Sequence, residues 1–242
     1  MKAFILAAGI GSRLGDLTID LPKCLVPVAG KPILEYQLDA LLANGITDVA
    51  IVLGYKKEKI LAFLESKEKY KNMNFTFALN PEYATTNSSY SYWQARSLIG
   101  SEPYIHLNCD IVLFAPLIKR LKESPYENVI LVDKKVQLNG SMEQVLLDGD
   151  RIIKMDNANL LGAQGRGSGM AKLSPAAVVV MKERVESFIR NGDKNQHCHG
   201  LMRYALTQVP FYAFDVGDSL IREINTKEEL REAEEAIGGQ LQ

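Results

Sequence analysis

The chain of 242 residues has little of what a disulfide-stabilised or membrane-embedded protein needs. It has three cysteines, Cys24, Cys109 and Cys198, which are far apart and odd in number. This pattern fits neither a disulfide framework nor a paired metal-binding motif, and it predicts reduced thiols in a cytoplasmic protein. No apolar stretch approaches the roughly 18 residues that a membrane span requires. We therefore expect no membrane contact.

An excess of charge of one sign is also absent. Lys and Arg number 28 and Asp and Glu number 29, which gives a net charge of -1 with the signs interspersed along the chain. Nucleic acids and anionic lipid surfaces are bound by clustered Lys and Arg side chains. The composition therefore predicts neither as a partner, and any polyanion must be bound locally.

Apolar runs and helical patterns alternate along the first half of the chain. The first nine residues superficially look like a short signal peptide, but the phosphate-handling loop that follows favours a buried strand that feeds it. We expect strands at 2–7, 48–53, 74–79 and 104–109, separated by helices near 34–42, 57–69 and 90–98. This alternation predicts an α/β fold with a doubly wound, mostly parallel, Rossmann-like sheet.

The regular alternation of strands and helices ends after residue 110. A β-hairpin is expected around Asp148-Gly149-Asp150, and residues 157–170, with four glycines among polar residues, are expected to form a flexible loop that acts as a lid. Ser174-Pro175 and the pair Thr226 and Glu229 are helix-start signals. Further elements are expected at 116–123 and 175–190 (helices) and at 128–133, 143–147, 151–155 and 209–214 (strands). Because no linker-like stretch occurs, we expect one domain over residues 1–242, with residues about 134–172 and 192–208 forming a hairpin-containing appendage.

The most informative stretch follows the first expected strand. Residues 6–14 read LAAGIGSRL, and residues 21–32 read LPKCLVPVAGKP. Glycines at the carboxyl end of a strand let main-chain N–H groups approach a phosphate, and Arg13 and Lys23 add two positive charges. The pattern predicts a triphosphate site. A dinucleotide-binding loop would have glycine in place of Leu14, and the Gly-Lys-Ser/Thr triplet of a P-loop is missing.

Taken together, these residues closely resemble the signature of the sugar-phosphate nucleotidyltransferase superfamily. The likeness is greatest to choline-phosphate and phosphonate cytidylyltransferase-like enzymes, and later segments extend it in order: Asn80-Pro81, Asn87 to Ser91, Asn108-Cys109-Asp110 and Glu223 to Thr226. The matching loop positions are Gly9, Gly11, Ser12, Arg13, Pro22, Lys23, Pro27, Val28, Gly30, Lys31 and Pro32.

The resemblance implies an activity and a set of roles. The expected reaction is Mg²⁺-dependent transfer of CMP from CTP to a small phosphate monoester or phosphonate, with pyrophosphate released; sugar 1-phosphates with UTP or dTTP are the alternative. Arg13, Lys23 and Asp110 are the expected catalytic residues, with Arg13 on the leaving phosphates and Lys23 on the α-phosphate and the acceptor oxygen. The expected nucleotide-binding residues are Leu6, Ala7, Ala8, Gly9, Gly11, Ser12, Arg13, Lys23, Asn80, Asn87 and Ser88.

The resemblance also implies a Mg²⁺ site at Asp110 and Asn225. Asn225 stands where the nearest relatives usually have aspartate, but an amide oxygen can still coordinate Mg²⁺ without adding charge. Asp215 or Asp218 is the alternative second ligand. The asparagine leaves open a nucleotide-binding regulatory homologue without catalysis, and the alternating fold leaves open a dinucleotide-dependent oxidoreductase.

The acceptor side is the least determined part of the sequence. A choline group would be expected among aromatic side chains, and residues 140–145 and 195–204 offer few. Adjacent His197, Cys198 and His199 are interpreted as a solvated loop because neighbouring residues rarely bind one ion together. Arg203 adds to the polar character. The candidate acceptor-binding residues Gln144, Arg166, His197 and His199 indicate a polar or acidic acceptor. The oligomeric state stays open, a homodimer included.

Overall fold

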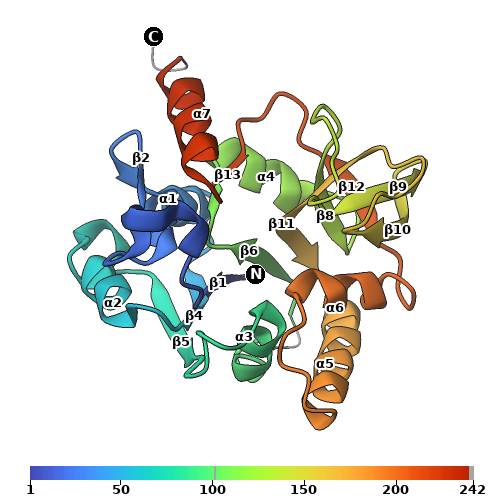
Figure 1. Cartoon of the computed structure of the whole chain (residues 1–242), viewed down its shortest axis with the longest axis horizontal. Coiled ribbons are helices and arrows are strands. Elements are labelled where there is room, and N and C mark those ends of the chain that lie inside the picture. Colours follow the sequence, from blue (N-terminus) through green and yellow to red (C-terminus); the bar gives the residue numbers. More distant parts are fainter. Residues whose placement is uncertain (101, 240–242) are drawn as a thin grey trace.

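The computed structural model describes residues 1–100 and 102–239. Within them a nine-stranded mixed sheet runs in the order β5-β4-β1-β6-β11-β8-β12-β10-β9 (Figure 1). The strands are β1 (Lys2–Ala7), β4 (Asp48–Leu53), β5 (Asn74–Leu79), β6 (Tyr104–Asn108), β8 (Val129–Asp133), β9 (Gln144–Asp148), β10 (Arg151–Asp156), β11 (Gly165–Leu173) and β12 (Tyr212–Asp215).

Most strands of the sheet point in one direction. β5, β4, β1 and β6 pair in parallel, as do β8 and β12. β11 is antiparallel to β6 and β8, and β10 is antiparallel to β12 and β9, so within the described residues only these two strands oppose the other seven. The expected α/β class with a mostly parallel sheet is confirmed.

Helices cover both faces of this sheet because successive strand residues point to opposite sides. In β1, Ala3, Ile5 and Ala7 pack in the same core cluster as α1 (Ile33–Ala43), α2 (Lys57–Glu65) and α4 (Ala115–Glu123). Phe4 and Leu6 pack on the other face with α3 (Ser88–Gln94), α5 (Pro175–Arg190) and α6 (Cys198–Ala205). The central strand is thus buried on both faces, which explains its uninterrupted apolar sequence.

The expected helix starts are confirmed in detail. The Ser174 hydroxyl accepts a hydrogen bond from the N–H of Ala177 at the start of α5. Thr226 and Glu229 form the expected capping box of α7 (Lys227–Gly238). The helix expected at 57–69 ends earlier, at Glu65, and a 3-10 turn follows at Glu68–Tyr70. No helix in the described residues is long and apolar enough to cross a bilayer.

Two expectations about the second half are wrong. The expected flexible loop at 157–170 ends at Gln164, and residues 165–173 form β11 in the middle of the sheet. Its glycines mark close packing: a Cβ at Gly165 would lie 2.5 Å from Val132 Cγ1, and one at Gly169 would lie 2.8 Å from Asn108 Cβ. The expected solvated loop at 197–199 is also wrong, because Cys198 begins α6 and its side chain is buried.

A short strand pair, separate from the main sheet, brings a late segment of the chain beside the end of β6. β7 (Ile111–Val112) pairs antiparallel with β13 (Arg222–Glu223), and the N–H of Ile224 donates to the carbonyl of Asp110 at 2.8 Å. A second small pair joins β2 (Pro27–Val28) to β3 (Lys31–Pro32) beside α1. The β7–β13 pair places Asn225 next to Asp110, 115 residues earlier in the chain.

Candidate active site

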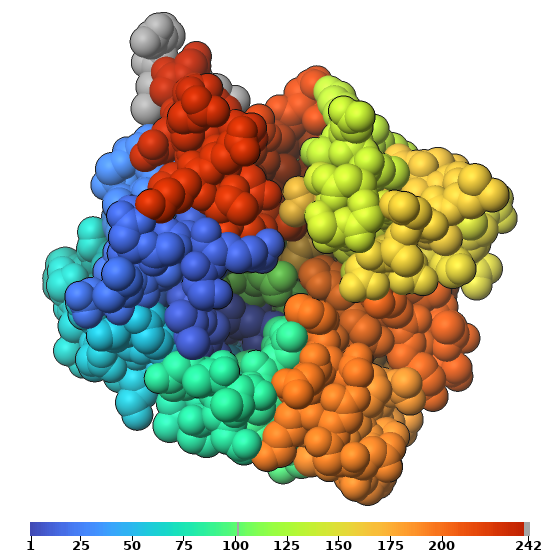
Figure 2. Space-filling view, in the orientation of Figure 1, coloured from blue at the N-terminus to red at the C-terminus, as the bar shows by residue number. Residues whose placement is uncertain are grey.

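A cleft of about 510 Å³ opens at the carboxyl ends of β1 and β6. Figure 2 shows it as a hollow in the middle of the molecule, walled by segments from the beginning, middle and end of the chain. In a mostly parallel sheet the carboxyl ends of the strands are where ligands bind. The cleft is therefore the place where the sequence-predicted residues should meet.

Lys23 lies at the centre of a polar network in this cleft. Its Nζ donates to Asp110 Oδ2 at 2.6 Å and to Asn225 Oδ1 at 2.8 Å, and Arg13 Nη2 donates to the same Asn225 oxygen at 2.7 Å. The side chains of Lys23 and Asp110 are only 11% and 19% exposed, so water screens their interaction weakly. The structure thus brings all four of these predicted residues together.

The glycine-containing loop forms the floor beside Lys23. Leu6, Ala8, Gly9, Gly11 and Ser12 line the cleft. Gly11 has a left-handed backbone (φ 74°), and a Cβ there would lie 2.9 Å from Lys23 Cβ, so glycine is needed for the turn. Ala7 is the exception among the predicted nucleotide-binding residues, because it points to the opposite face of β1 and packs in the core.

Gly9 offers a direct test of the loop. A Cβ at Gly9 would meet no atom within 4 Å, so we expect Gly9→Ala to leave the free energy of unfolding unchanged within about 0.5 kcal/mol. The added methyl group would occupy space that a phosphate needs for close approach to the main chain, so nucleotide affinity should fall about tenfold. Calorimetric titration with nucleoside triphosphates and urea unfolding measure the two effects.

Gly11→Ala is the contrasting variant, because its strained backbone and the contact with Lys23 should lower stability as well. Wild-type nucleotide affinity in a folded Gly9→Ala protein would show that phosphates do not approach this loop.

Three further residues expected to bind the nucleotide, Asn80, Asn87 and Ser88, also line the cleft. Their side chains make hydrogen bonds in and around the loop before α3. Asn80 is buried and donates to Thr86 Oγ1 at 3.1 Å and Ser91 Oγ at 3.0 Å. Asn87 caps α3, accepting from the N–H of Ser88 at 2.8 Å. Ser88 Oγ accepts from the N–H of Cys198, which ties α3 to α6. These contacts hold the wall rigid.

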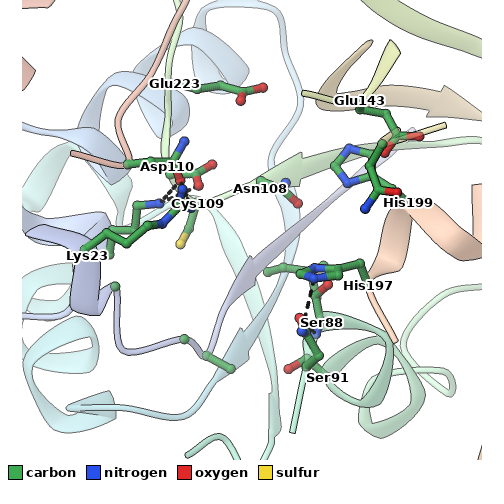
Figure 3. Close-up of a pocket in the computed structure, with 18 of the residues that line it drawn as sticks. Lys23, Ser88, Ser91, Asn108, Cys109, Asp110, Glu143, His197, His199 and Glu223 are labelled. Atoms are coloured by element: carbon green, nitrogen blue, oxygen red, sulfur yellow. Dashed lines mark hydrogen bonds and ion pairs between the residues drawn. The ribbon is translucent and has the colours of Figure 1, made fainter. Parts of the chain in front are cut away.

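Two carboxylate–guanidinium pairs and two imidazoles complete the lining of the cleft. Glu143 accepts from Arg203 Nε and Nη2, both at 2.6 Å. Glu223 pairs with Arg166 and accepts from the N–H of Gly169. Figure 3 shows Glu143, His197 and His199 across the pocket from Lys23 and Asp110.

Burial shifts the pKa of several of these groups. Burial raises the pKa of Glu223, and the nearby Asp110 carboxylate adds to the rise, while the Arg166 guanidinium opposes it. Burial, followed by His199 and Arg203, lowers the pKa of His197, which is therefore neutral near pH 7. His106, beneath the wall on β6, has its pKa lowered to about 3 by burial.

The structure does not bring every candidate acceptor residue to the cleft. Arg166, His197 and His199 line it, but Gln144 does not. The Gln144 side chain is buried, donates to the carbonyl of Asn139 and accepts from the N–H of Leu160, so it supports the loop around β9. The sequence-based expectation that Gln144 binds the acceptor is therefore wrong.

Sequence reasoning missed Glu143 and Glu223 as site residues. Both are carboxylates with little exposure, 7% for Glu143 and 16% for Glu223, and both line the cleft. One signal was available: Glu223 and Asn225 are two residues apart in an extended segment, and such residues face the same side. Glu143 offers no such signal, because its neighbour Gln144 is equally polar.

Asp215 and Asp218, the alternatives to Asn225 as second Mg²⁺ ligand, lie outside the cleft. Asp215 is 3.8 Å from Lys134 Nζ, and Asp218 pairs with Lys135. Neither lines the cleft. Asn225 is therefore the candidate that the fold places beside Asp110.

The donor atoms at Asp110 and Asn225 suit Mg²⁺. Asp110 Oδ2 lies 2.6 Å from Lys23 Nζ and Asn225 Oδ1 lies 2.8 Å from it, so the two oxygen atoms converge on one place. In the described part of the chain no cluster of three or more His, Cys, Asp or Glu side chains could hold a metal ion. Mg²⁺ usually takes one or two protein oxygens and completes its shell with water and substrate phosphates, so a site with two ligands fits it.

Comparison with known proteins adds three findings. A family model described as nucleotidyl transferase matches residues 2–137. A CMP-5'-(3-aminopropyl)phosphonate synthase from Streptomyces rubellomurinus is 28% identical over 210 residues, which cover 86% of this chain and 33% of that protein. A mannose-1-phosphate guanyltransferase from Schizosaccharomyces pombe is 36% identical over 139 residues, or 55% of this chain and 38% of that protein. The matched region thus spans well under half of either relative.

A solved structure, that of the CTP:phosphocholine cytidylyltransferase from Streptococcus pneumoniae, has the same fold. It superposes with a TM-score of 0.78 over 98% of both chains, at 23% sequence identity. At this identity the likeness shows the fold, and it agrees with the Rossmann-like architecture expected from the sequence.

Proposed function

Because the chain belongs to the nucleotidyl transferase family, we propose that it transfers CMP from CTP to a small phosphate monoester or phosphonate and releases pyrophosphate. The observation that carries this proposal is the meeting of Lys23, Asp110 and Asn225 at the end of the glycine-containing loop. A lysine beside two oxygen ligands for Mg²⁺ is a site for joining two phosphate-bearing substrates.

In the proposed reaction an acceptor oxygen attacks the α-phosphorus of the triphosphate. A new P–O bond forms as the bond between the α-phosphorus and the oxygen that bridges the α- and β-phosphates breaks. That oxygen leaves with pyrophosphate, so no covalent enzyme intermediate is needed. Lys23 would neutralise charge on the α-phosphate and hold the acceptor oxygen, while Arg13 and the N–H groups of the loop hold the leaving phosphates. When bound at Asp110 and Asn225, Mg²⁺ would supply further neutralisation of phosphate charge.

In this proposal substrate binding changes the partners of the basic residues. Arg13 and Lys23 both donate to Asn225 Oδ1 in the structure. Triphosphate oxygens would take over these donors and leave the Asn225 and Asp110 oxygens available to a cation. The nucleotide and Mg²⁺ should therefore bind together rather than separately.

The choice of CTP rests on the motif resemblance and on the Streptomyces relative, whose name describes a CMP-phosphonate product. The yeast relative, a guanyltransferase, favours GTP and a sugar 1-phosphate as the second candidate. We further propose that residues 1–242 work as one domain, with 134–172 and 192–208 contributing the acceptor side. Both segments supply residues to the cleft, among them Glu143, Arg166 and Arg203.

The test is pyrophosphate release with Mg²⁺, each common nucleoside triphosphate and a panel of acceptors. The panel holds aminoethylphosphonate, phosphocholine, phosphoethanolamine, glycerol 3-phosphate, 3-phosphoglycerate and sugar 1-phosphates. We expect release with CTP and one class of non-sugar acceptor. Release with GTP and mannose 1-phosphate alone would favour the second candidate, and CTP binding without release across the panel would favour a regulatory protein.

A further inference from the structure

The far wall of the cleft presents hydrogen-bond donors on one short helix. His199 and Arg203 are four residues apart, so they lie one turn apart on the same face of α6, and His197 is the residue that caps this helix. All three side chains line the cleft. His197 and His199 face it from the side opposite Lys23 and Asp110, where the reacting phosphorus atoms would lie (Figure 3). Glu143, to which Arg203 donates, lies on the same side as His199.

Glu143 holds the Arg203 guanidinium in place through both of its carboxylate oxygens, so these oxygens are not free to bind a ligand. Two of the five guanidinium N–H groups of Arg203 point to Glu143. The Glu143 side chain is only 7% exposed, whereas that of Arg203 is 27% exposed. The group offered to a ligand is therefore the guanidinium with its remaining donors, held in place by a buried carboxylate.

The hydrogen bonds of His197 define which of its nitrogens carries the proton. Asn87 Oδ1 accepts from the N–H of Ser88, so the atom that faces His197 is the amide nitrogen Nδ2, 3.3 Å from His197 Nε2. An amide nitrogen donates, so His197 Nε2 accepts and the neutral ring carries its proton on Nδ1. His199 Nε2 is buried with no hydrogen-bond partner in the described residues.

The wall lacks the features that would bind a cation. Among the described residues that line the cleft, Tyr83 is the only Phe, Tyr or Trp. The Trp93 ring is covered by Arg96, whose guanidinium carbon lies 3.5 Å from the ring centroid. A quaternary ammonium group would need an aromatic cage. A primary ammonium would need a carboxylate, but Glu143 is paired with Arg203, Glu223 with Arg166 and Asp110 with Lys23.

We propose, building on the function proposed above, that the acceptor carries a carboxylate at the end remote from its phosphorus, and that Arg203 binds this carboxylate with help from His197 and His199. A guanidinium held by a buried partner gives a carboxylate two parallel N–H donors at fixed positions. Arg203 is thus the residue that selects the acceptor class, and Glu143 is its positioning residue.

The experiment compares matched acceptors in calorimetric titrations of the protein loaded with Mg²⁺ and a non-hydrolysable CTP analogue. 3-Phosphoglycerate and glycerol 3-phosphate differ only in a carboxylate against a hydroxymethyl group, and 3-phosphonopropionate and 2-aminoethylphosphonate differ in the sign of the terminal charge. We expect the carboxylate member of at least one pair to bind about tenfold tighter or more, as for one charged hydrogen-bonding pair. Equal affinity within both pairs, or binding of neither member, overturns the proposal.

Variants separate this inference from the proposed function. Arg203→Gln should remove the preference for the carboxylate while leaving affinity for the CTP analogue unchanged, and Glu143→Gln with Arg203→Gln should do the same without leaving a buried charge unpaired. Arg96→Gln, an arginine outside the cleft, is the matched control and should keep the preference. A preference that survives both Arg203 variants overturns the assignment, whereas failure of the wild type to bind the CTP analogue contradicts the proposed function itself.

Discussion

Lys23→Met is expected to lower kcat/KM for pyrophosphate release by about 100-fold to 1000-fold, the cost of removing one preorganised charged donor from a transition state. Lys23 is the single cation that contacts both Asp110 and Asn225 among the described residues. Methionine keeps the unbranched apolar stem of the side chain, one atom shorter, but cannot neutralise the α-phosphate. Steady-state kinetics at saturating substrates measure the loss.

Lys31→Met is the matched control for this variant. Lys31 also belongs to the sequence motif and also pairs with a carboxylate, Asp39 at 2.5 Å, but it does not line the cleft. Asp39 keeps Lys69 and Tyr70 as partners, so the fold should tolerate the change. We expect near-wild-type rates for Lys31→Met. A Lys23→Met protein that unfolds like the wild type and keeps its rate would show that Lys23 has no part in catalysis.

Asp110→Asn should cause a loss of similar size, about 100-fold or more in kcat, because it removes the charged oxygen ligand expected for Mg²⁺ and the anionic partner of Lys23. The amide has nearly the same shape and Lys23 keeps its bond to Asn225, so the protein should still fold, with some loss of stability from the broken ion pair. The Mg²⁺ concentration that gives half the maximal rate should rise as well. Rates measured across a Mg²⁺ series, with circular dichroism to confirm folding, test both expectations.

Asp215→Asn and Asp218→Asn provide the controls. Both carboxylates pair with lysines outside the cleft, and neither should alter the dependence on Mg²⁺. A shift in Mg²⁺ dependence for either of these variants, with none for Asp110→Asn, would place the metal elsewhere.

The first half of the fold was predictable because its signals are local. Each parallel strand from β1 to β6 is an apolar run, and each helix between them is marked by spacing of apolar residues on one face. The motif resemblance to sugar-phosphate nucleotidyltransferases, confirmed by the family match, depends on the same region. The turn at Gly11 and the position of Lys23 follow directly from it.

β11 could not be predicted from local pattern. Gly165, Gly167 and Gly169 are typical of loops in isolation, yet here they let β11 approach Val132, Val145 and Asn108 closely. This reason for glycine depends on neighbours that lie far away in the sequence. The helix α6 was missed because it is short and its first turn reads His-Cys-His in the sequence, which is typical of a polar loop. Its apolar face becomes evident only where Cys198, Leu201 and Met202 pack in the core.

The phosphate side of the site was more predictable than the acceptor side for the same reason. Gly9, Arg13 and Lys23 share one motif, whereas Glu143 and Arg203 meet across 60 residues and reveal their pairing only after folding. The sequence pattern names Gln144 as an acceptor-binding residue, but in the structure its side chain supports the loop around β9, and the neighbouring Glu143 lines the cleft. Cytoplasmic location and oligomeric state stay predictions.

The contact between Arg13 and Asn225 joins residues 212 positions apart, and Lys23 reaches both Asp110 and Asn225. Contacts between such distant residues close large loops, whose entropic cost must be met before the contacts can form. A nascent or refolding chain can therefore acquire its first parallel strands and helices and still lack a complete site. During folding, enzymatic activity should therefore appear only when the last long-range contacts have formed. Helical content should appear earlier, because it depends on local contacts.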